Sequence, residues 1–224
     1  VLDLSALGAG QGFVIRGVAT GAGGGDNAGY SVSAAGDVNG DGYADVLIGA
    51  PNANGADGAP GQAYVIYGSP QGPGTADAQG RRVVDLATLS PDQGFVVLGH
   101  DPTNAFGTVV SGAGDLNGDG LSDLVFGAPY ADDKGPYAGK AYVLYGFENG
   151  PAALDGAGRA VVDVTLVSLL TGMVVQGGGA LGYAGSDVAG AGDVNGDGRA
   201  DLIVGAPFDD LGSGVSGAAY LVYG

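Results

Sequence analysis

Three short segments of the sequence bring oxygen-bearing side chains close together. They are GDVNGDGYADVLIGAP (36–51), GDLNGDGLSDLVFGAP (114–129) and GDVNGDGRADLIVGAP (192–207). Counted from the first aspartate, each segment has Asp at positions 1, 5 and 9 and Asn at position 3. Carboxylates this close repel one another, by ~1 kcal/mol per pair even in bulk water. A cation bound among them would offset that repulsion, so the pattern predicts a metal site.

The residue types favour calcium over other ions. Calcium takes six to eight oxygen ligands in a flexible arrangement, whereas magnesium keeps most of its waters. Glycine at position 6 permits a sharp turn, and the unrelated side chains at position 7 indicate that only the backbone carbonyl is used there. The sequence therefore predicts three Ca²⁺ ions, held by Asp37, Asn39, Asp41, Tyr43 and Asp45; by Asp115, Asn117, Asp119, Leu121 and Asp123; and by Asp193, Asn195, Asp197, Arg199 and Asp201.

Two other types of loop share part of this pattern. An EF-hand has Glu at position 12, but here that position is Ile48, Phe126 or Val204. A dockerin loop leads into a helix, whereas an apolar strand-like run follows each loop in this chain. A set of solvated Asp/Asn/Gly turns without a metal is the remaining alternative.

The loops belong to a repeat of 78 residues that covers nearly the whole chain. Asp37, Asp115 and Asp193 keep this spacing, and so do the pair Arg81 and Arg159. Each repeat contains four short runs rich in β-branched and aromatic residues, bounded by Gly, Pro, Asn or Asp, which is typical of strands. Four strands at a fixed period predict an all-β fold, a β-propeller built from four-stranded blades, three per chain. A β-sandwich is the alternative.

The expected strands have the same order in each repeat. The first run is small and Gly-rich, which suits the innermost position where neighbouring blades converge. The first strands are 30–36, 108–114 and 186–192; the second are 45–51, 123–129 and 201–207; the third are 63–68, 141–146 and 219–224; the fourth are 94–99 and 172–177, with a strand of the same type at 12–17.

Composition excludes several functional classes. The net charge is −17, and 23 of the 24 acidic residues are Asp, which is consistent with metal loops and turns. The chain has only seven Lys and Arg residues, too few to favour binding to the phosphates of a nucleic acid. The absence of Cys excludes disulfides, thiolate catalysis and Cys-ligated zinc. No apolar run is long enough to predict a membrane span.

The loops and their flanking residues resemble FG-GAP repeats, found in the propeller of integrin α-subunits and in related bacterial surface proteins. The resemblance rests on the D-x-N-x-D-G-x-x-D loops, on Gly-Ala-Pro at 49–51, 127–129 and 205–207, and on Phe106–Gly107. The Phe-Gly element is replaced by Ala28–Gly29 and Ala184–Gly185 in the other repeats. The resemblance implies one calcium per loop and an extracellular or cell-surface module that serves in recognition or adhesion.

The first expected strand is of the fourth type and the last is of the third type, and this order predicts how the ring is completed. We expect residues 1–224 to form one propeller module, with blade repeats at about 28–99, 105–177 and 183–224. The strand at 12–17 would complete the last blade of a second copy, so that a homodimer closes a six-bladed ring, within the usual range of four to eight blades. A three-blade piece of a seven-bladed propeller is the alternative.

The sequence leaves more than one function open. We expect a calcium-binding, non-catalytic adhesion or recognition module with a protein or glycan ligand; a structural or oligomerising spacer is the alternative. A glycan hydrolase using Asp132 and Asp210 is weaker, because residues that recur in successive blades suggest structure. His100 is the only histidine, and the sequence lacks the G-x-S-x-G nucleophile elbow that is typical of many Ser-His-Asp hydrolases. Tyr64 and Tyr67, with their repeats, are expected to pack within the blades rather than stack on sugars.

Overall fold

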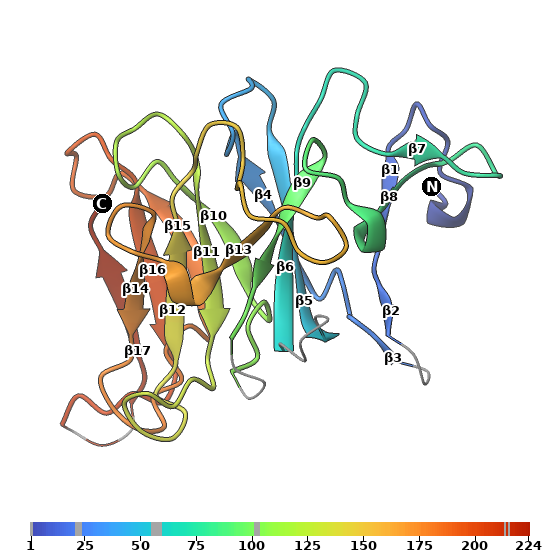
Figure 1. The fold of residues 1–224 in the computed structure, drawn as a ribbon. Coiled ribbons are helices and arrows are strands. Elements are labelled where there is room, and N and C mark those ends of the chain that lie inside the picture. Colours follow the sequence, from blue (N-terminus) through green and yellow to red (C-terminus); the bar gives the residue numbers. More distant parts are fainter. Residues whose placement is uncertain (1, 21–23, 55–59, 101–103, 213, 215) are drawn as a thin grey trace.

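The computed structural model describes residues 2–20, 24–54, 60–100, 104–212, 214 and 216–224, and the fold of these residues is all-β (Figure 1). Three blade sheets follow one another along this part of the chain. Blade 1 contains β4 (Ser31–Gly36), β5 (Asp45–Asn54), β6 (Pro60–Ile66) and β9 (Gly94–Leu98); blade 2 contains β10 (Val110–Gly114), β11 (Asp123–Ala128), β12 (Lys140–Leu144) and β14 (Gly172–Gln176); blade 3 contains β15 (Asp187–Gly192), β16 (Asp201–Ala206) and β17 (Ala218–Val222).

The strands within each blade pair antiparallel in a register that repeats from blade to blade. In blade 1, Tyr64 of β6 lies opposite Ile48 of β5 and Val96 of β9. The equivalent Tyr142 of β12 lies opposite Phe126 and Val174. The expected order of four strands is therefore present in blades 1 and 2, and blade 3 has the first three.

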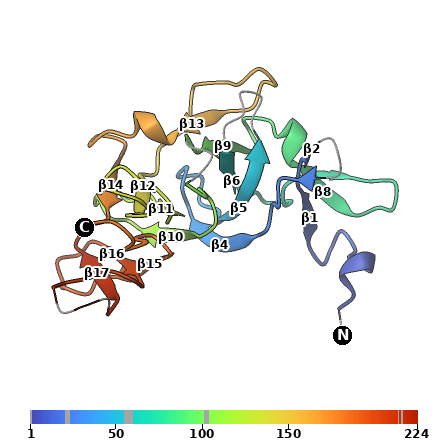
Figure 2. The same ribbon diagram turned by 90° about the horizontal axis from the view of Figure 1, so that it is seen from below.

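The first strands of neighbouring blades lie side by side on the inner side of an arc (Figure 2). Small residues make this approach possible, as predicted from the Gly-rich runs. A Cβ added to Gly112 of β10 would lie 2.6 Å from the carbonyl oxygen of Ala34, and one on Gly190 of β15 would lie 2.9 Å from that of Ala113. The Ser31 hydroxyl also accepts a hydrogen bond from the Val110 N–H across the two blades, at 3.1 Å.

The hydrophobic core lies between the blades. Leu47, Val65 and Phe95 of blade 1 pack against Leu124 and Phe126 of blade 2. Val125 and Val143, on the other face of blade 2, pack against Leu202 and Val204 of blade 3. Each blade is therefore stabilised mainly by its neighbours, as expected for a repeat protein.

Two short strands that the sequence pattern did not indicate connect one blade to the next. β13 (Val161–Asp163) precedes the fourth strand of blade 2 but pairs parallel with β9 of blade 1. β8 (Arg82–Asp85) likewise pairs parallel with β1 (Phe13–Arg16), and β7 (Thr75–Ala76) flanks β8. The hairpin of β2 (Ala19–Thr20) and β3 (Gly24–Gly25) leads into blade 1.

A 3₁₀ turn lies before β1 and another directly follows each of β8 and β13. The turns are η1 (Leu4–Ala6), η2 (Leu86–Thr88) and η3 (Val164–Leu166). An aspartate begins each turn and accepts a hydrogen bond from the N–H two residues later: Asp3 from Ser5, Asp85 from Ala87 and Asp163 from Thr165.

Phe106, the one intact Phe of the Phe-Gly elements, packs between blades 1 and 2. It is buried, and its ring centroid lies 5.4 Å from that of Phe126 and 5.9 Å from that of Tyr142. We expect Phe106→Ala to lower the free energy of unfolding by ~3–5 kcal/mol, because it removes a buried ring and leaves a cavity. Urea unfolding measures the change. The control Tyr30→Ala removes an exposed ring and should cost less than ~0.5 kcal/mol; equal costs for the two would contradict this packing role.

Candidate metal centres

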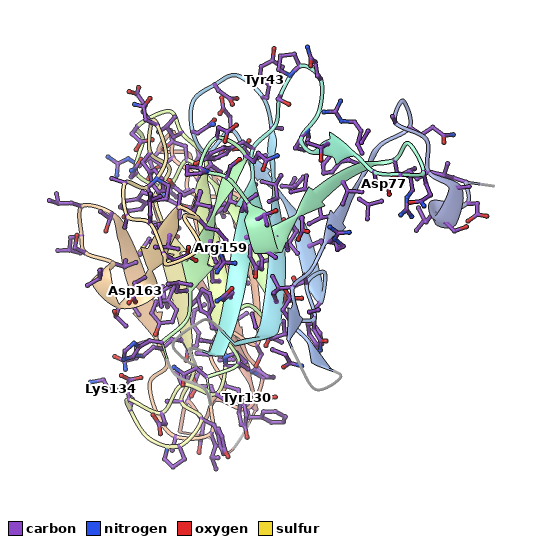
Figure 3. The ribbon with its side chains drawn as sticks, turned by 45° about the vertical axis from the view of Figure 1, so that its right-hand side comes forward. Tyr43, Asp77, Tyr130, Lys134, Arg159 and Asp163 are labelled. Carbon is purple, nitrogen blue, oxygen red and sulfur yellow. The ribbon has the colours of Figure 1, made fainter. Side chains whose placement is uncertain are left out.

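The three acidic loops lie at the same end of the blades. Each joins the first strand to the second strand: β4 to β5, β10 to β11 and β15 to β16. Figure 3 shows Tyr43 of the first loop at one end of the sheets and Tyr130, in the loop after β11, at the opposite end. The acidic loops and the loops after Gly-Ala-Pro therefore lie on opposite faces of the molecule.

The aspartate at position 1 organises the backbone of its own loop. The Asp37 carboxylate accepts hydrogen bonds from the N–H groups of Gly40, Asp41 and Gly42, at 2.8, 3.1 and 2.9 Å. Asp115 and Asp193 receive the same three bonds in the second and third loops. Gly42 has a φ of +87°, with +89° and +93° at the equivalent Gly120 and Gly198, so the predicted positive-φ turn at position 6 is present.

The aspartate at position 9 joins two separate parts of its blade. Asp45 is buried, and its carboxylate accepts the Val38 N–H at 2.9 Å and the Gly68 N–H, just after β6, at 2.8 Å. Asp123 does the same with Leu116 and Gly146, and Asp201 with Val194 and Gly224. The side chain therefore fixes the start of the acidic loop to the end of the third strand.

Burial makes the charge on this aspartate costly. Loss of solvent raises the pKa of Asp45 to about 6; its two backbone hydrogen bonds oppose the rise, and the carboxylates of Asp41 and Asp37 add to it. The pKa of Asp123 is raised to about 6 for the same reasons. None of the ion pairs in the described chain includes a loop carboxylate, so no Lys or Arg of that part offsets the loop charge by direct contact.

The remaining predicted ligands also bond within their loops. The Asn39 amide donates to the Asp41 carboxylate at 3.0 Å, and Asp41 accepts the N–H of Tyr43 at 2.9 Å. The second and third loops repeat these contacts. Tyr43, at position 7, has an exposed side chain, in agreement with a role for its backbone alone.

The donor set fits a hard cation, although the acidic side chains are not gathered tightly around one point. In the described residues, no three His, Cys, Asp or Glu side chains form a group that could hold a metal ion. Each carboxylate nonetheless has about four lone-pair directions, and the two bonds made by Asp45 leave others free. Residues at positions 1, 3, 5, 7 and 9 could therefore contribute oxygen atoms to calcium after a small adjustment of the loop.

The other residues singled out from the sequence are either exposed on loops or buried within the blades. Asp132 and Asp210 are exposed, in the loops after β11 and β16. His100 is exposed just after β9. Tyr64 is buried, and its hydroxyl donates to the Gln62 side chain at 2.9 Å; Tyr67 is buried as well, so packing is the role that the structure supports for both.

An aromatic cluster on the face opposite the acidic loops was not found from the sequence. Tyr130, Tyr137, Tyr183 and Phe208 form this cluster. Tyr137 and Tyr183 stack with ring centroids 5.4 Å apart, Tyr130 meets both edge-on, and Phe208 meets Tyr183 edge-on at 5.4 Å. Tyr130, Tyr137 and Phe208 are exposed. The rings come from three separate loops, so no local pattern could indicate the cluster.

The cluster is held by backbone contacts between its loops. The N–H of Tyr183 donates to the Tyr137 carbonyl at 3.0 Å, and that of Leu181 donates to the Pro136 carbonyl at 2.8 Å. Tyr137 and Tyr183 both have left-handed backbones, with φ of +55° and +54°. Such a conformation costs about 1–3 kcal/mol in a residue other than glycine and is frequent at functional sites.

Among the described residues, no helix has the length and apolar character needed to cross a membrane.

Comparison with protein families identifies the repeat. The family model described as "FG-GAP repeat" matches residues 28–66, 106–144 and 184–222. These ranges begin at the Phe-Gly position, contain the acidic loop and end in the third strand of each blade.

Curated relatives of two kinds share this region. The bovine phosphatidylinositol-glycan-specific phospholipase D is 28% identical over 196 residues, covering 87% of this chain and 20% of that protein. Integrin alpha-PS2 of Drosophila melanogaster is 30% identical over 129 residues, and integrin alpha pat-2 of Caenorhabditis elegans is 33% identical over 112 residues. These matches cover 58% and 50% of this chain and 8% of each integrin. The chain therefore spans a fifth or less of the length of these relatives.

The buried position-9 aspartate should have a structural role that does not need a metal. We expect Asp123→Ala to lower the free energy of unfolding by ~3 kcal/mol, because two backbone N–H groups lose a charged acceptor. The control Asp119→Ala removes an exposed carboxylate of the same loop and should cost about 1 kcal/mol or less. Urea unfolding in excess chelator measures both without a metal contribution. A cost for Asp123→Ala no larger than that of the control would contradict the role.

Proposed function

The chain belongs to the FG-GAP repeat family, and we propose that it is a calcium-binding, non-catalytic propeller module of an extracellular or cell-surface protein that serves in adhesion or recognition. Calcium at the three acidic loops would stabilise the blades. The ligand would bind at the opposite face. The relatives include integrin alpha subunits of two invertebrates, and the observation that carries the recognition role is the exposed aromatic cluster.

The charge of the loops supports the calcium proposal. Each loop places three carboxylates within nine residues, and the buried one is the most costly to charge, as the raised pKa values of Asp45 and Asp123 indicate. A divalent cation would offset this cost, and oxygen donors of this kind match calcium better than softer metals.

The position of the cluster supports a ligand site rather than a packing role. At the junction of blades 2 and 3 the cluster consists of Tyr130, Tyr137, Tyr183 and Phe208. The residues 78 positions earlier in the sequence are Asn52, Ala59, Ala105 and Tyr130. A packing requirement of the repeat would place rings at every equivalent position of both junctions, but the earlier junction has one ring where the later one has four. Asymmetry among repeats is typical of a functional site, because function needs one site whereas the fold needs every blade.

The residues around the rings favour a protein ligand. Leu181 and Leu211 are exposed near the cluster, on the loops that carry Tyr183 and Phe208. Exposed tyrosines with neighbouring apolar side chains are characteristic of protein-binding surfaces. Asp132, Asp133 and Asp210 are exposed on the same loops, and the net charge of −17 favours association with a positively charged partner. A glycan stacked on the rings is the alternative ligand.

Two other functions stay open as alternatives. A structural or oligomerising spacer would need no ligand, and a glycan hydrolase would use exposed carboxylates such as Asp132 and Asp210. A protein panel and a glycan array, each followed by a hydrolysis assay, separate the three. Specific binding without turnover supports recognition, turnover supports the hydrolase, and the absence of both supports the spacer.

The proposal includes a homodimer that completes the ring. Three blades describe only part of a circle, and two copies would bring the number to six, within the usual four to eight. β1 lies at one end of the blade row and β17 at the other (Figure 1), and in the proposed dimer each would meet the opposite end of the second copy.

Calcium should raise the thermal stability of the chain. At free calcium 100 times its dissociation constant, each occupied site adds about 2.7 kcal/mol to the free energy of unfolding. We expect the melting temperature to rise with calcium, to fall with chelator, and to respond much less to magnesium. Differential scanning calorimetry measures this, with isothermal titration for the number of sites. Identical melting curves in calcium and chelator would remove the metal from the proposal.

The aromatic cluster should carry ligand binding. We expect the variant Tyr137→Asn/Tyr183→Asn to weaken binding to a hit from the protein panel by about tenfold or more, because interface tyrosines often contribute over 1 kcal/mol each. Asparagine tolerates the left-handed backbone, and blade 1 already has Asn27 at the position of Tyr183, with a φ of +55°. The control Tyr30→Asn removes an exposed tyrosine elsewhere. Equal binding by both variants and the unchanged protein would exclude the cluster.

A further inference from the structure

We infer that Arg199 weakens calcium binding at the second acidic loop (115–123), so that this loop binds the ion less tightly than the first loop (37–45). The inference rests on the calcium proposal above and deepens it, because it makes the loops unequal. It depends on a contact between neighbouring loops that the structure contains twice. A leucine makes this contact with the first loop, and an arginine makes it with the second.

Neighbouring acidic loops are joined by the same backbone hydrogen bond. The Ser122 N–H of the second loop donates to the Asp37 carbonyl of the first at 2.9 Å, and the Ala200 N–H of the third donates to the Asp115 carbonyl of the second at 2.9 Å. The strands that lead into the loops, β4, β10 and β15, lie side by side (Figure 2). Position 8 of one loop is therefore fixed to position 1 of the preceding loop, and the residue at position 7 is held beside it.

The side chain at position 7 reaches the glycine at position 4 of the preceding loop. A Cβ added to Gly40 would lie 3.0 Å from Cδ2 of Leu121, and one added to Gly118 would lie 3.3 Å from Nε of Arg199. The N–H of each glycine donates to the position-1 carboxylate of its own loop, at 2.8 and 2.7 Å. The two side chains therefore have equivalent places next to proposed calcium ligands, and only one of them is charged.

The charge of Arg199 also acts on blade 2. None of the ion pairs in the described chain includes Arg199, so no carboxylate there neutralises it by direct contact. Burial raises the pKa of the Tyr145 hydroxyl, just after β12; the charge of Asp123 adds to the rise, and the charge of Arg199 opposes it. The guanidinium and the position-9 carboxylate of the second loop therefore act on the same group.

A fixed positive charge at this place opposes calcium in two ways. It repels the ion, and it already offsets part of the repulsion among carboxylates that the ion would relieve. A unit charge several ångströms from a divalent ion changes its affinity by about three- to tenfold when water screens the pair. Leu121 has no charge with which to affect the first loop in this way. The first loop should therefore fill before the second as the calcium concentration rises.

Substitution of Arg199 tests the inference when each loop is read separately. The Gly42 and Gly120 N–H groups donate to the position-1 carboxylates of the first and second loops, so their NMR signals report calcium binding loop by loop. We expect Arg199→Leu to tighten calcium binding at the second loop by about three- to tenfold and to leave the first loop unchanged. Arg199→Lys, which keeps the charge, is the control and should change this affinity by less than about twofold.

The reverse substitution transfers the charge to the first loop. Leu121→Arg places a guanidinium beside Gly40 and should weaken calcium binding at the first loop by about three- to tenfold. Both effects should shrink at high salt, because salt screens charges at the surface. The third loop is not used as a readout, because Arg199 belongs to it: hydrogen bonds lower the pKa of Asp197, and the charge of Arg199 lowers it further.

The possible results separate this inference from the calcium proposal. Calcium binding with an unchanged affinity of the second loop in Arg199→Leu would overturn the inference and leave the calcium proposal standing. Equal changes at the first and second loops would also overturn it, because net charge rather than position would then be responsible. The absence of calcium binding at both loops would overturn the calcium proposal, and this inference with it.

Discussion

The structure depends on one buried interaction, the contact of the position-9 aspartate with the backbone. Asp45, Asp123 and Asp201 each connect the beginning of an acidic loop to the end of the third strand. A carboxylate enclosed in this way needs hydrogen-bond donors and, where other acids are near, a compensating charge. Two factors therefore act together on the loop. Backbone amides hold its conformation, and a bound cation would lower the electrostatic free energy of the crowded carboxylates. The acidic loop has the same conformation in all three blades because each blade repeats this contact.

Local features of the sequence predicted the blades and their loops well. The spacing of Asp, Asn and Gly indicated the turn, and short runs rich in β-branched and aromatic residues indicated the strands, because both depend on residues close in the chain. The Gly-rich first strands were placed on the inner side for a steric reason that Gly112 and Gly190 confirm. The calcium ligands were predicted from donor chemistry alone, and the structure gives the loop geometry without testing the ion.

Features that depend on contacts between blades could not be predicted. β13 has only three residues and pairs with a strand of the preceding blade, so neither its length nor its neighbours in the sequence indicate a strand. The rings of the aromatic cluster lie far apart in the sequence, between residues 130 and 208. Taken singly, each one has the sequence context of an ordinary loop residue.

The parallel pairing of β13 with β9 has a consequence for how the molecule responds to stress. Residues 161–163 belong in sequence to blade 2 but are hydrogen-bonded into the sheet of blade 1, so the two blades cannot separate without breaking these backbone bonds. Local opening of blade 1 at this edge is therefore coupled to the segment that leads into the fourth strand of blade 2. A force that pulls blades 1 and 2 apart would have to break the β13–β9 bonds as well as the side-chain packing between the blades.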